Sequence, residues 1–302
     1  MANQRQILNA FNNSYERQIR IAERQSYKQA YQVYINAFRS ATDEFIDGKL
    51  PEQINILDTL AFRQLFIDIY ERQGMRFAKW YQKIFIKVAT KNDDKNIYET
   101  IWSARLAQYG EERAQDIVTT VEKSMMDQFN AEMKRLYADP EFQELGAEAQ
   151  ARELRKKNFW QKKARFMALR VARTESNAAA NLGIEESSLS MFGAQEMEKR
   201  WITARDEKVR DTHRQAEAQG AIPFDSSFSV GQSQMKRPGD PAGGASEVIN
   251  CRCRIVTLPK KETLDNLFDE LTKPSQGATA SGVQGSTNEG FVTSSLISAL
   301  FG

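Results

Sequence analysis

Three side chains that can bind a metal ion or carry a proton stand in the second half of the chain. His213 is the only histidine of the sequence, and Cys251 and Cys253 are its only cysteines. Two thiolates and an imidazole supply three of the four ligands that tetrahedral zinc prefers, and a carboxylate can supply the fourth. Such a site also requires a bent backbone, because cysteines two residues apart on a straight strand are poorly spaced for one ion. The candidates for a fourth ligand are Asp206, Asp211 and Asp240.

Two other interpretations of these residues stay open. In the first, the cysteines are small buried thiols beside a hydrogen-bonded histidine. In the second, they form the centre of a metal-dependent hydrolase or nuclease, or one cysteine is a nucleophile with His213 as its base. A single histidine leaves too few positions for both a base and a ligand, and nothing in the sequence marks either cysteine as reactive. We therefore expect free thiols, no catalytic residue, no metal and no other cofactor.

The elements around these residues are expected to bring them together. Residues 199–204 have the pattern of a strand, and Asp206 is placed to cap the helix that follows. His213 lies on that predicted helix and is expected to point toward the strand. A further strand is predicted over residues 248–256, and its two-residue repeat sends both cysteine thiols to one face. We therefore expect the sulfurs to meet the imidazole.

The first 190 residues carry apolar side chains at spacings of three and four, which predicts a bundle of helices. Later stripes predict further helices, one of which is interrupted at Asp139-Pro140. The first stripe is aromatic and predicts a helix that ends near Gly48. It is either an ordinary packing face or a face that docks another protein. This stripe consists of Tyr27, Tyr31, Tyr34, Phe38, Ala41 and Phe45.

The predicted fold is mainly α, with an N-terminal helical bundle, a small α+β unit and a flexible C-terminal tail. We place the helical body at residues 1–190 and the compact α+β unit at 191–262. The tail, 263–302, is rich in Ser, Gly, Thr and Gln, a composition that cannot offset its ordering entropy by burial. Its apolar end, residues 291–301, is either a short hook for a partner or a frayed terminus.

The overall charge excludes a strong long-range field, because the net charge is only +2. No run of about 18 apolar residues predicts a membrane span, and the first residues lack the apolar stretch of a secretory signal. Attraction to a polyanion must therefore come from local clusters of Lys and Arg.

One such cluster lies at residues 152–173, which contain nine basic residues and a single acid, Glu153. Within it, four apolar residues from Trp160 to Val171 fall at helical spacings, so we predict one basic helix that seats this stripe on the body. Outward cations bind phosphates without sequence preference. Alternatively, these cations pair with acidic residues or keep the surface soluble. Binding to a membrane is not favoured, because the apolar stripe is too narrow. The predicted DNA-binding residues are Arg152, Arg155, Lys156, Lys157, Lys162, Lys163, Arg165 and Arg170.

An ordered set of short motifs over about residues 150–258 resembles the phage Mu F-like head morphogenesis family. The elements are Arg173-Thr174-Glu175 with Asn177, then Lys199-Arg200-Trp201, then the Pro238–Pro241 loop, and finally Asn250-Cys251-Arg252-Cys253. Each element alone is weak, whereas the ordered set is specific. The residues that we assign to this structural motif are Arg173, Glu175, Trp201, Asp206, Arg210, His213, Asp240, Asn250, Cys251 and Cys253.

The resemblance implies a non-enzymatic minor capsid protein of a tailed bacteriophage. Such a protein is present in the virion, in the head interior, and in the host cytoplasm during assembly. Its implied partners are the portal protein, the inner capsid shell and double-stranded DNA, which it binds without sequence preference. No membrane is expected among its partners. Its implied role is to assist head assembly, packaging or DNA ejection. The family supplies no catalytic role to carry over to His213 or the cysteines.

Overall fold

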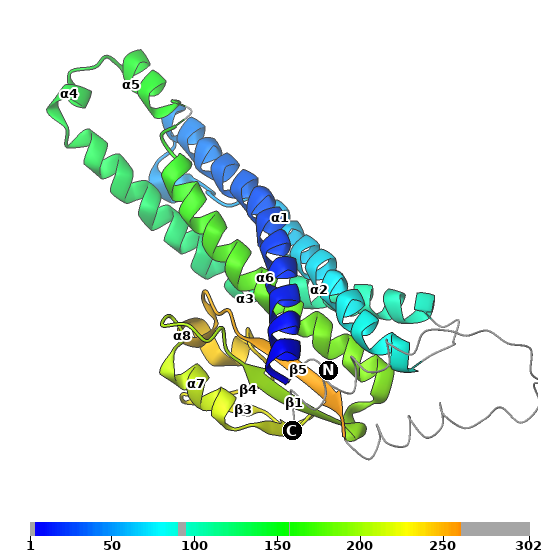
Figure 1. Cartoon of the computed structure of the whole chain (residues 1–302). Helices are drawn as coiled ribbons and strands as arrows, with labels where there is room; N and C mark the ends of the chain where they lie inside the picture. Colours follow the sequence, from blue (N-terminus) through cyan, green and yellow to red (C-terminus); the bar gives the residue numbers. More distant parts are fainter. Residues whose placement is uncertain (1–3, 90–94, 157, 261–302) are drawn as a thin grey trace, which may run out of the picture.

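The computed structural model describes residues 4–89, 95–156 and 158–260, and the predicted tail, 263–302, therefore lies outside the described residues. Four long helices lie side by side in an elongated bundle (Figure 1). This arrangement confirms the mainly α fold. In the described part of the chain, no helix is both long and apolar enough to cross a bilayer. The four helices are α1 (Gln4–Ile46), α2 (Thr59–Ala89), α3 (Lys95–Tyr137) and α6 (Gln161–Phe192).

Short helices connect the long ones at the end of the bundle that lies away from the sheet (Figure 1). A 3-10 turn, Pro51–Gln53, follows α1. The predicted interruption at Asp139-Pro140 is confirmed: Asp139 accepts a hydrogen bond from the Glu141 amide and caps α4 (Pro140–Gln143). The next helix, α5, spans Ala147–Leu154.

The aromatic stripe of α1 is a packing face, as one of the two interpretations has it. Tyr34 and Phe38 are fully buried, and the Phe38 ring stacks on Trp160 with 4.8 Å between the ring centroids. The Trp160 indole nitrogen also donates a 2.7 Å hydrogen bond to Thr42 Oγ1. These contacts fix the start of α6 against the end of α1.

The backbones of α2 and α6 touch where two glycines face each other. A Cβ added at Gly183 would lie 2.1 Å from the Gly74 carbonyl oxygen, closer than any two such atoms can approach. The helices therefore pack at a distance that only glycine permits. This approach places α6 in the middle of the bundle, where it contacts α1, α2 and α3.

The second unit contains two small antiparallel sheets and several short helical segments. After the 3-10 turn Ala194–Glu196, the strands β1, β2 and β5 form one sheet in the order β2-β1-β5, and β3 and β4 form the other. Trp201 pairs with Ile255 across β1 and β5. The bounds are β1 (Met197–Ile202), α7 (Asp211–Ala218), β2 (Ala221–Pro223), β3 (Phe228–Val230), β4 (Ser233–Met235), a 3-10 turn (Pro241–Gly243), α8 (Gly244–Val248) and β5 (Arg254–Pro259).

The three-stranded sheet contributes to two buried clusters. Ile202 and Ile255 pack in one cluster with Tyr15 of α1 and Phe77 of α2. Trp201 packs in the other cluster with residues of α7, β3 and β4. Every residue of β5 is buried, so the sheet joins the helical body to the rest of the C-terminal unit.

Candidate functional site

The motif on α6 points its side chains to two different partners. Glu175 faces the helical body, where it is 3% exposed, pairs with Arg113 of α3 at 3.2 Å and accepts a 2.8 Å hydrogen bond from the Tyr70 hydroxyl. Burial alone would lower the pKa of the Arg113 guanidinium, but the Glu175 carboxylate more than reverses this effect and the pKa is raised. The buried charge is therefore compensated.

The other motif residues of α6 hold the loop that carries the cysteines. Thr174 Oγ1 accepts a 3.0 Å hydrogen bond from the Asn250 amide. Asn177 Nδ2 donates at 3.0 Å to the Cys253 carbonyl, and Asn181 Nδ2 donates to the same oxygen at 3.2 Å. Asn181 Oδ1 accepts from the amide of Ile255 at 2.7 Å. Backbone groups of Asn250, Cys253 and Ile255 are thereby satisfied by side chains of α6.

The loop Pro238–Pro241 also packs on α6. Gly239 has a φ of +84°, and a Cβ there would lie 2.8 Å from the backbone of Ala178. Glycine is required on both counts, namely the left-handed backbone and the close approach. Asp240 follows it and accepts hydrogen bonds from the amides of Lys236 and Ala242.

His213 and the two cysteines form one buried cluster, as the sequence predicted. The imidazole Nδ1 lies 3.3 Å from Cys253 Sγ and 3.7 Å from Cys251 Sγ. The three residues are at most 2% exposed. Trp201 closes one side of the cluster, with its ring edge-on to the imidazole at 5.3 Å between centroids.

A carboxylate lies at the far edge of the imidazole. His213 Nε2 is 3.0 Å from Glu247 Oε2, although the angle falls outside hydrogen-bond geometry. Thr212 Oγ1 donates to the same carboxylate oxygen at 2.8 Å. Glu247 lies on α8, and sequence reasoning missed it because nothing in its spacing connects it to His213.

Both cysteines are free thiols, as predicted. The hydrogen bonds with Cys253 lower the pKa of Cys251, whereas the hydrogen bond to Cys251 and burial raise the pKa of Cys253. A thiol, a histidine and a carboxylate in a row have the order of groups that activates a cysteine nucleophile. Here the sulfurs are buried among apolar side chains, so a substrate cannot reach them without local opening.

Two local predictions around this cluster are wrong. Asp206 does not cap α7, which begins at Asp211; it forms a two-pronged ion pair with Arg252, and its pKa is lowered by the Arg252 hydrogen bond. The predicted strand over 248–256 begins only at Arg254, because Asp240 caps a 3-10 turn that leads into α8 and Val248 closes that helix.

Several motif residues line a polar cleft of about 510 Å³ between α1, α6 and the C-terminal unit. Arg173, Lys208 and Arg210 face it together with Asn250. Arg210 also donates a 2.6 Å hydrogen bond to the Ile249 carbonyl, which ties it to the cysteine loop. Arginine and lysine outnumber the cleft's acids, which are Glu16 and Glu23.

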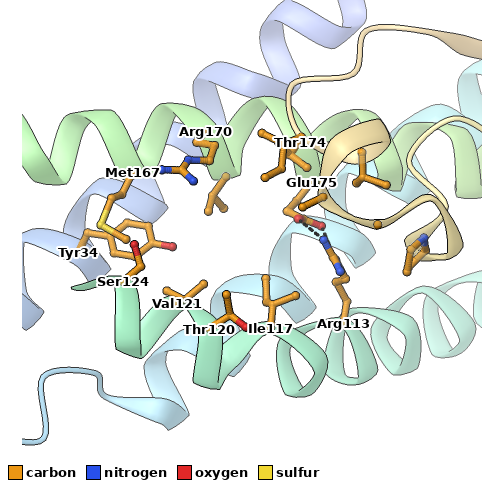
Figure 2. A pocket seen from close by; sticks show the side chains of 16 residues that line it. Tyr34, Arg113, Ile117, Thr120, Val121, Ser124, Met167, Arg170, Thr174 and Glu175 are labelled. Atoms are coloured by element: carbon orange, nitrogen blue, oxygen red, sulfur yellow. Dashed lines mark hydrogen bonds and ion pairs between the residues drawn. The ribbon is translucent and has the colours of Figure 1, made fainter. Parts of the chain in front are cut away.

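A second cavity, of about 340 Å³, separates α3 from α6 and is capped by the residues around α8. Figure 2 shows Tyr34 and Arg170 at one end and the Arg113–Glu175 pair at the other, with apolar side chains between them. The Tyr34 hydroxyl is buried and has no hydrogen-bond partner among the described residues. The cavity is therefore mostly apolar, with the buried Tyr34 hydroxyl at one end.

The basic segment is not one helix, in contrast to the prediction. The chain turns between Leu154, which ends α5, and Gln161, which begins α6, because Leu154 and Trp160 both bury their side chains. The apolar stripe itself is confirmed: Trp160, Ala164, Met167 and Val171 are all buried. Lys157 lies outside the described residues.

The predicted DNA-binding residues divide into two groups. Three of them pair with acids: Arg155 with Asp43, Lys156 with Glu153 and Lys163 with Glu132. Four others carry no ion pair among the described residues, namely Arg152, Lys162, Arg165 and Arg170. On α6, Lys162 and Arg165 share an exposed face with Phe166 and Leu169, which are 61% and 42% exposed.

Comparison with known proteins identifies the part of the chain that holds this cluster. Residues 142–256 match a family model described as Phage Mu protein F like protein. This part of the chain is therefore similar to the phage Mu F-like family. The match confirms the resemblance seen in the motifs, and the family suggests a phage head morphogenesis protein. No curated protein and no solved structure matches the chain.

The phage Mu F-like region depends on residues that its motifs did not reveal. Asn181 continues the helical spacing of Asn177 by four residues, and this signal was available in the sequence. Arg113 and Tyr70 lie before residue 142, outside the matched region, yet they hold Glu175. No sequence signal connects them to it.

The buried Lys199 of β1 makes the free energy of unfolding depend on pH. Its side chain is fully buried, lies over the rings of Phe224 and Phe228, and lacks a hydrogen-bond partner for Nζ among the described residues. Burial lowers the pKa of Lys199 to about 8. The unfolded chain therefore binds more protons than the folded one between pH 8 and the ordinary lysine pKa, so the free energy of unfolding rises with pH across that window.

We expect Lys199→Met to be more stable than the native protein at pH 7 by about 1–2 kcal/mol, because the variant buries no charge. Urea unfolding at pH 7, 8, 9 and 10 measures this difference, which should shrink as the pH rises through 8. The exposed Lys134→Met variant is the matched control and should show no such trend. A stability difference that stays constant with pH would contradict the assignment.

Proposed function

We propose that this chain is a minor capsid protein that acts in head morphogenesis of a tailed bacteriophage, in association with the portal and the procapsid. The observation that carries the proposal is that the four motif elements, all within the matched region, pack against α6 or against the His213 cluster. Asn177 of α6 holds the cysteine loop, Trp201 packs against His213, and the loop at Gly239 packs on Ala178 of α6. The family implies a place in the virion.

The burial of the cluster supports an assembly role over an enzymatic one. A hydrolase centred on His213 needs a site that substrate can enter, whereas His213 is 1% exposed. The network around it consists mostly of hydrogen bonds between helices, loops and strands far apart in the sequence. Such a network stabilises a fixed shape, which is what a component of an assembled head requires.

The portal is proposed as the partner on the basis of the family alone. Co-expression of this chain with the portal protein of the same phage tests it, with one of the two tagged. We expect both to elute together in size-exclusion chromatography after affinity purification. An unrelated tagged protein of similar charge is the control. Elution of the chain alone, with both proteins folded, would argue against the proposal.

DNA binding without sequence preference is proposed for the exposed face of α6. Lys162 and Arg165 lie one turn apart there, without an acidic partner among the described residues, beside the exposed ring of Phe166. Cations on such a face release counterions from DNA when they contact phosphates. The affinity should therefore depend steeply on salt concentration.

We expect the purified protein to retard duplex DNA of any sequence, and this retardation to vanish between about 50 and 200 mM salt. The variant Lys162→Glu/Arg165→Glu should weaken binding and reduce the slope of log affinity against log salt by roughly 2. The variant Arg24→Glu/Lys28→Glu carries the same charge change on exposed residues of α1 and serves as the control. Equal effects of the two variants would exclude the α6 face as the binding surface.

A further inference from the structure

We propose that His213, Cys251 and Cys253 bind one zinc ion, which fastens α7 to the loop before β5. The ligand atoms of the three residues all lie within 4.8 Å of one another. Bonds of about 2.3 Å to sulfur and about 2.0 Å to nitrogen, at tetrahedral angles, place a sulfur and a nitrogen roughly 3.5 Å apart. The two distances from Nδ1 to the sulfurs, 3.3 and 3.7 Å, bracket that value.

The backbone has the bend that two cysteines in this spacing require. Asn250 adopts a left-handed conformation with a φ of +57°, and residues 251–253 precede β5 instead of forming part of it. The Cys253 amide turns back and lies 3.4 Å from Cys251 Sγ, in a hydrogen bond to the sulfur. The loop therefore presents both sulfurs to one point, which a straight strand would not do.

The groups around the three ligands have the arrangement that surrounds a bound metal. A histidine ligand usually has a carboxylate or carbonyl at its second nitrogen, which fixes the ring. Here Nδ1 faces the sulfurs while Glu247 lies 3.0 Å from Nε2, and Thr212 holds that carboxylate. Asn177 and Asn181 hold the Cys253 carbonyl, so the cysteine loop is positioned from outside the site as well.

The aspartates considered from the sequence do not complete the site. Asp206 pairs with Arg252, Asp211 pairs with Arg214, and Asp240 accepts backbone hydrogen bonds. Among the described residues three ligands converge, one fewer than a closed structural zinc site has. Burial gives the ion a structural role, because a cross-link between residues 213 and 251–253 restricts a long segment of chain.

Cobalt(II) provides the sharpest test, because the full chain contains only two cysteines and one histidine. Protein freed of metal under reducing conditions is titrated with Co²⁺ alone. We expect a thiolate-to-cobalt charge-transfer absorption that saturates at one ion per chain, together with the strong visible bands of a tetrahedral site. Any such charge-transfer band must come from Cys251 and Cys253. Folded protein without this absorption would overturn the proposal.

A second measurement separates a native site from binding to an unfolded chain. Added Zn²⁺ should raise the midpoint of thermal unfolding of the metal-free protein, since only the folded state assembles all three ligands. The variant Glu247→Gln retains the ligands and should bind Co²⁺ with roughly 10–100-fold lower affinity. Glu112→Gln, on the exposed face of α3, is its control and should leave affinity unchanged. Cobalt bands without a rise in the unfolding midpoint would also overturn the proposal.

Discussion

The structure depends on the hydrogen bonds by which α6 holds the backbone of the cysteine loop. Asn177 and Asn181 both donate to the Cys253 carbonyl, and Asn181 accepts from the Ile255 amide. Each of these backbone groups, if left buried and unpaired, would lower the stability of the fold by about 1–3 kcal/mol. The side-chain amides of Asn177 and Asn181 therefore determine where β5 can lie. The sheet, the imidazole cluster and the loop at Gly239 are then placed relative to α6 rather than relative to one another.

The helix α6 consequently connects three regions of the structure with different surroundings. The start of α6 exposes Lys162 and Arg165, its middle pairs Glu175 with Arg113 inside the bundle, and its next turns hold the C-terminal unit. The contact between Gly183 and Gly74 prevents α6 from sliding on α2. The exposed face at the start of α6 is thus connected to the buried cluster by one continuous helix.

The spacing of apolar residues in the sequence predicted which helix faces are buried. It did not predict local features that depend on contacts between residues far apart in the sequence. The stripes on α1 and α6 were found because apolar side chains must face a core. The meeting of His213 with the cysteines was predicted from the repeats of a helix and a strand, but only the helix exists there: the cysteines lie in a bent loop before β5. The cap at Asp206 was wrong because α7 begins only at Asp211, while Asp206 lies in the preceding loop, accepts from the Lys208 amide and pairs with Arg252. The turn before α6 was missed because a helical spacing from Trp160 onward does not show where the preceding helix stops.

Hydrogen exchange resolved by residue tests most directly the claim that α6 and the C-terminal unit form one cooperative structure. The amides of Asn250 and Ile255, whose acceptors are side chains of α6, should exchange only with global unfolding, at the same free energy as amides in the middle of α6. Exchange of these two amides through a lower-energy local opening, while α6 stays protected, would show that the sheet is placed independently of the helix and would contradict the account.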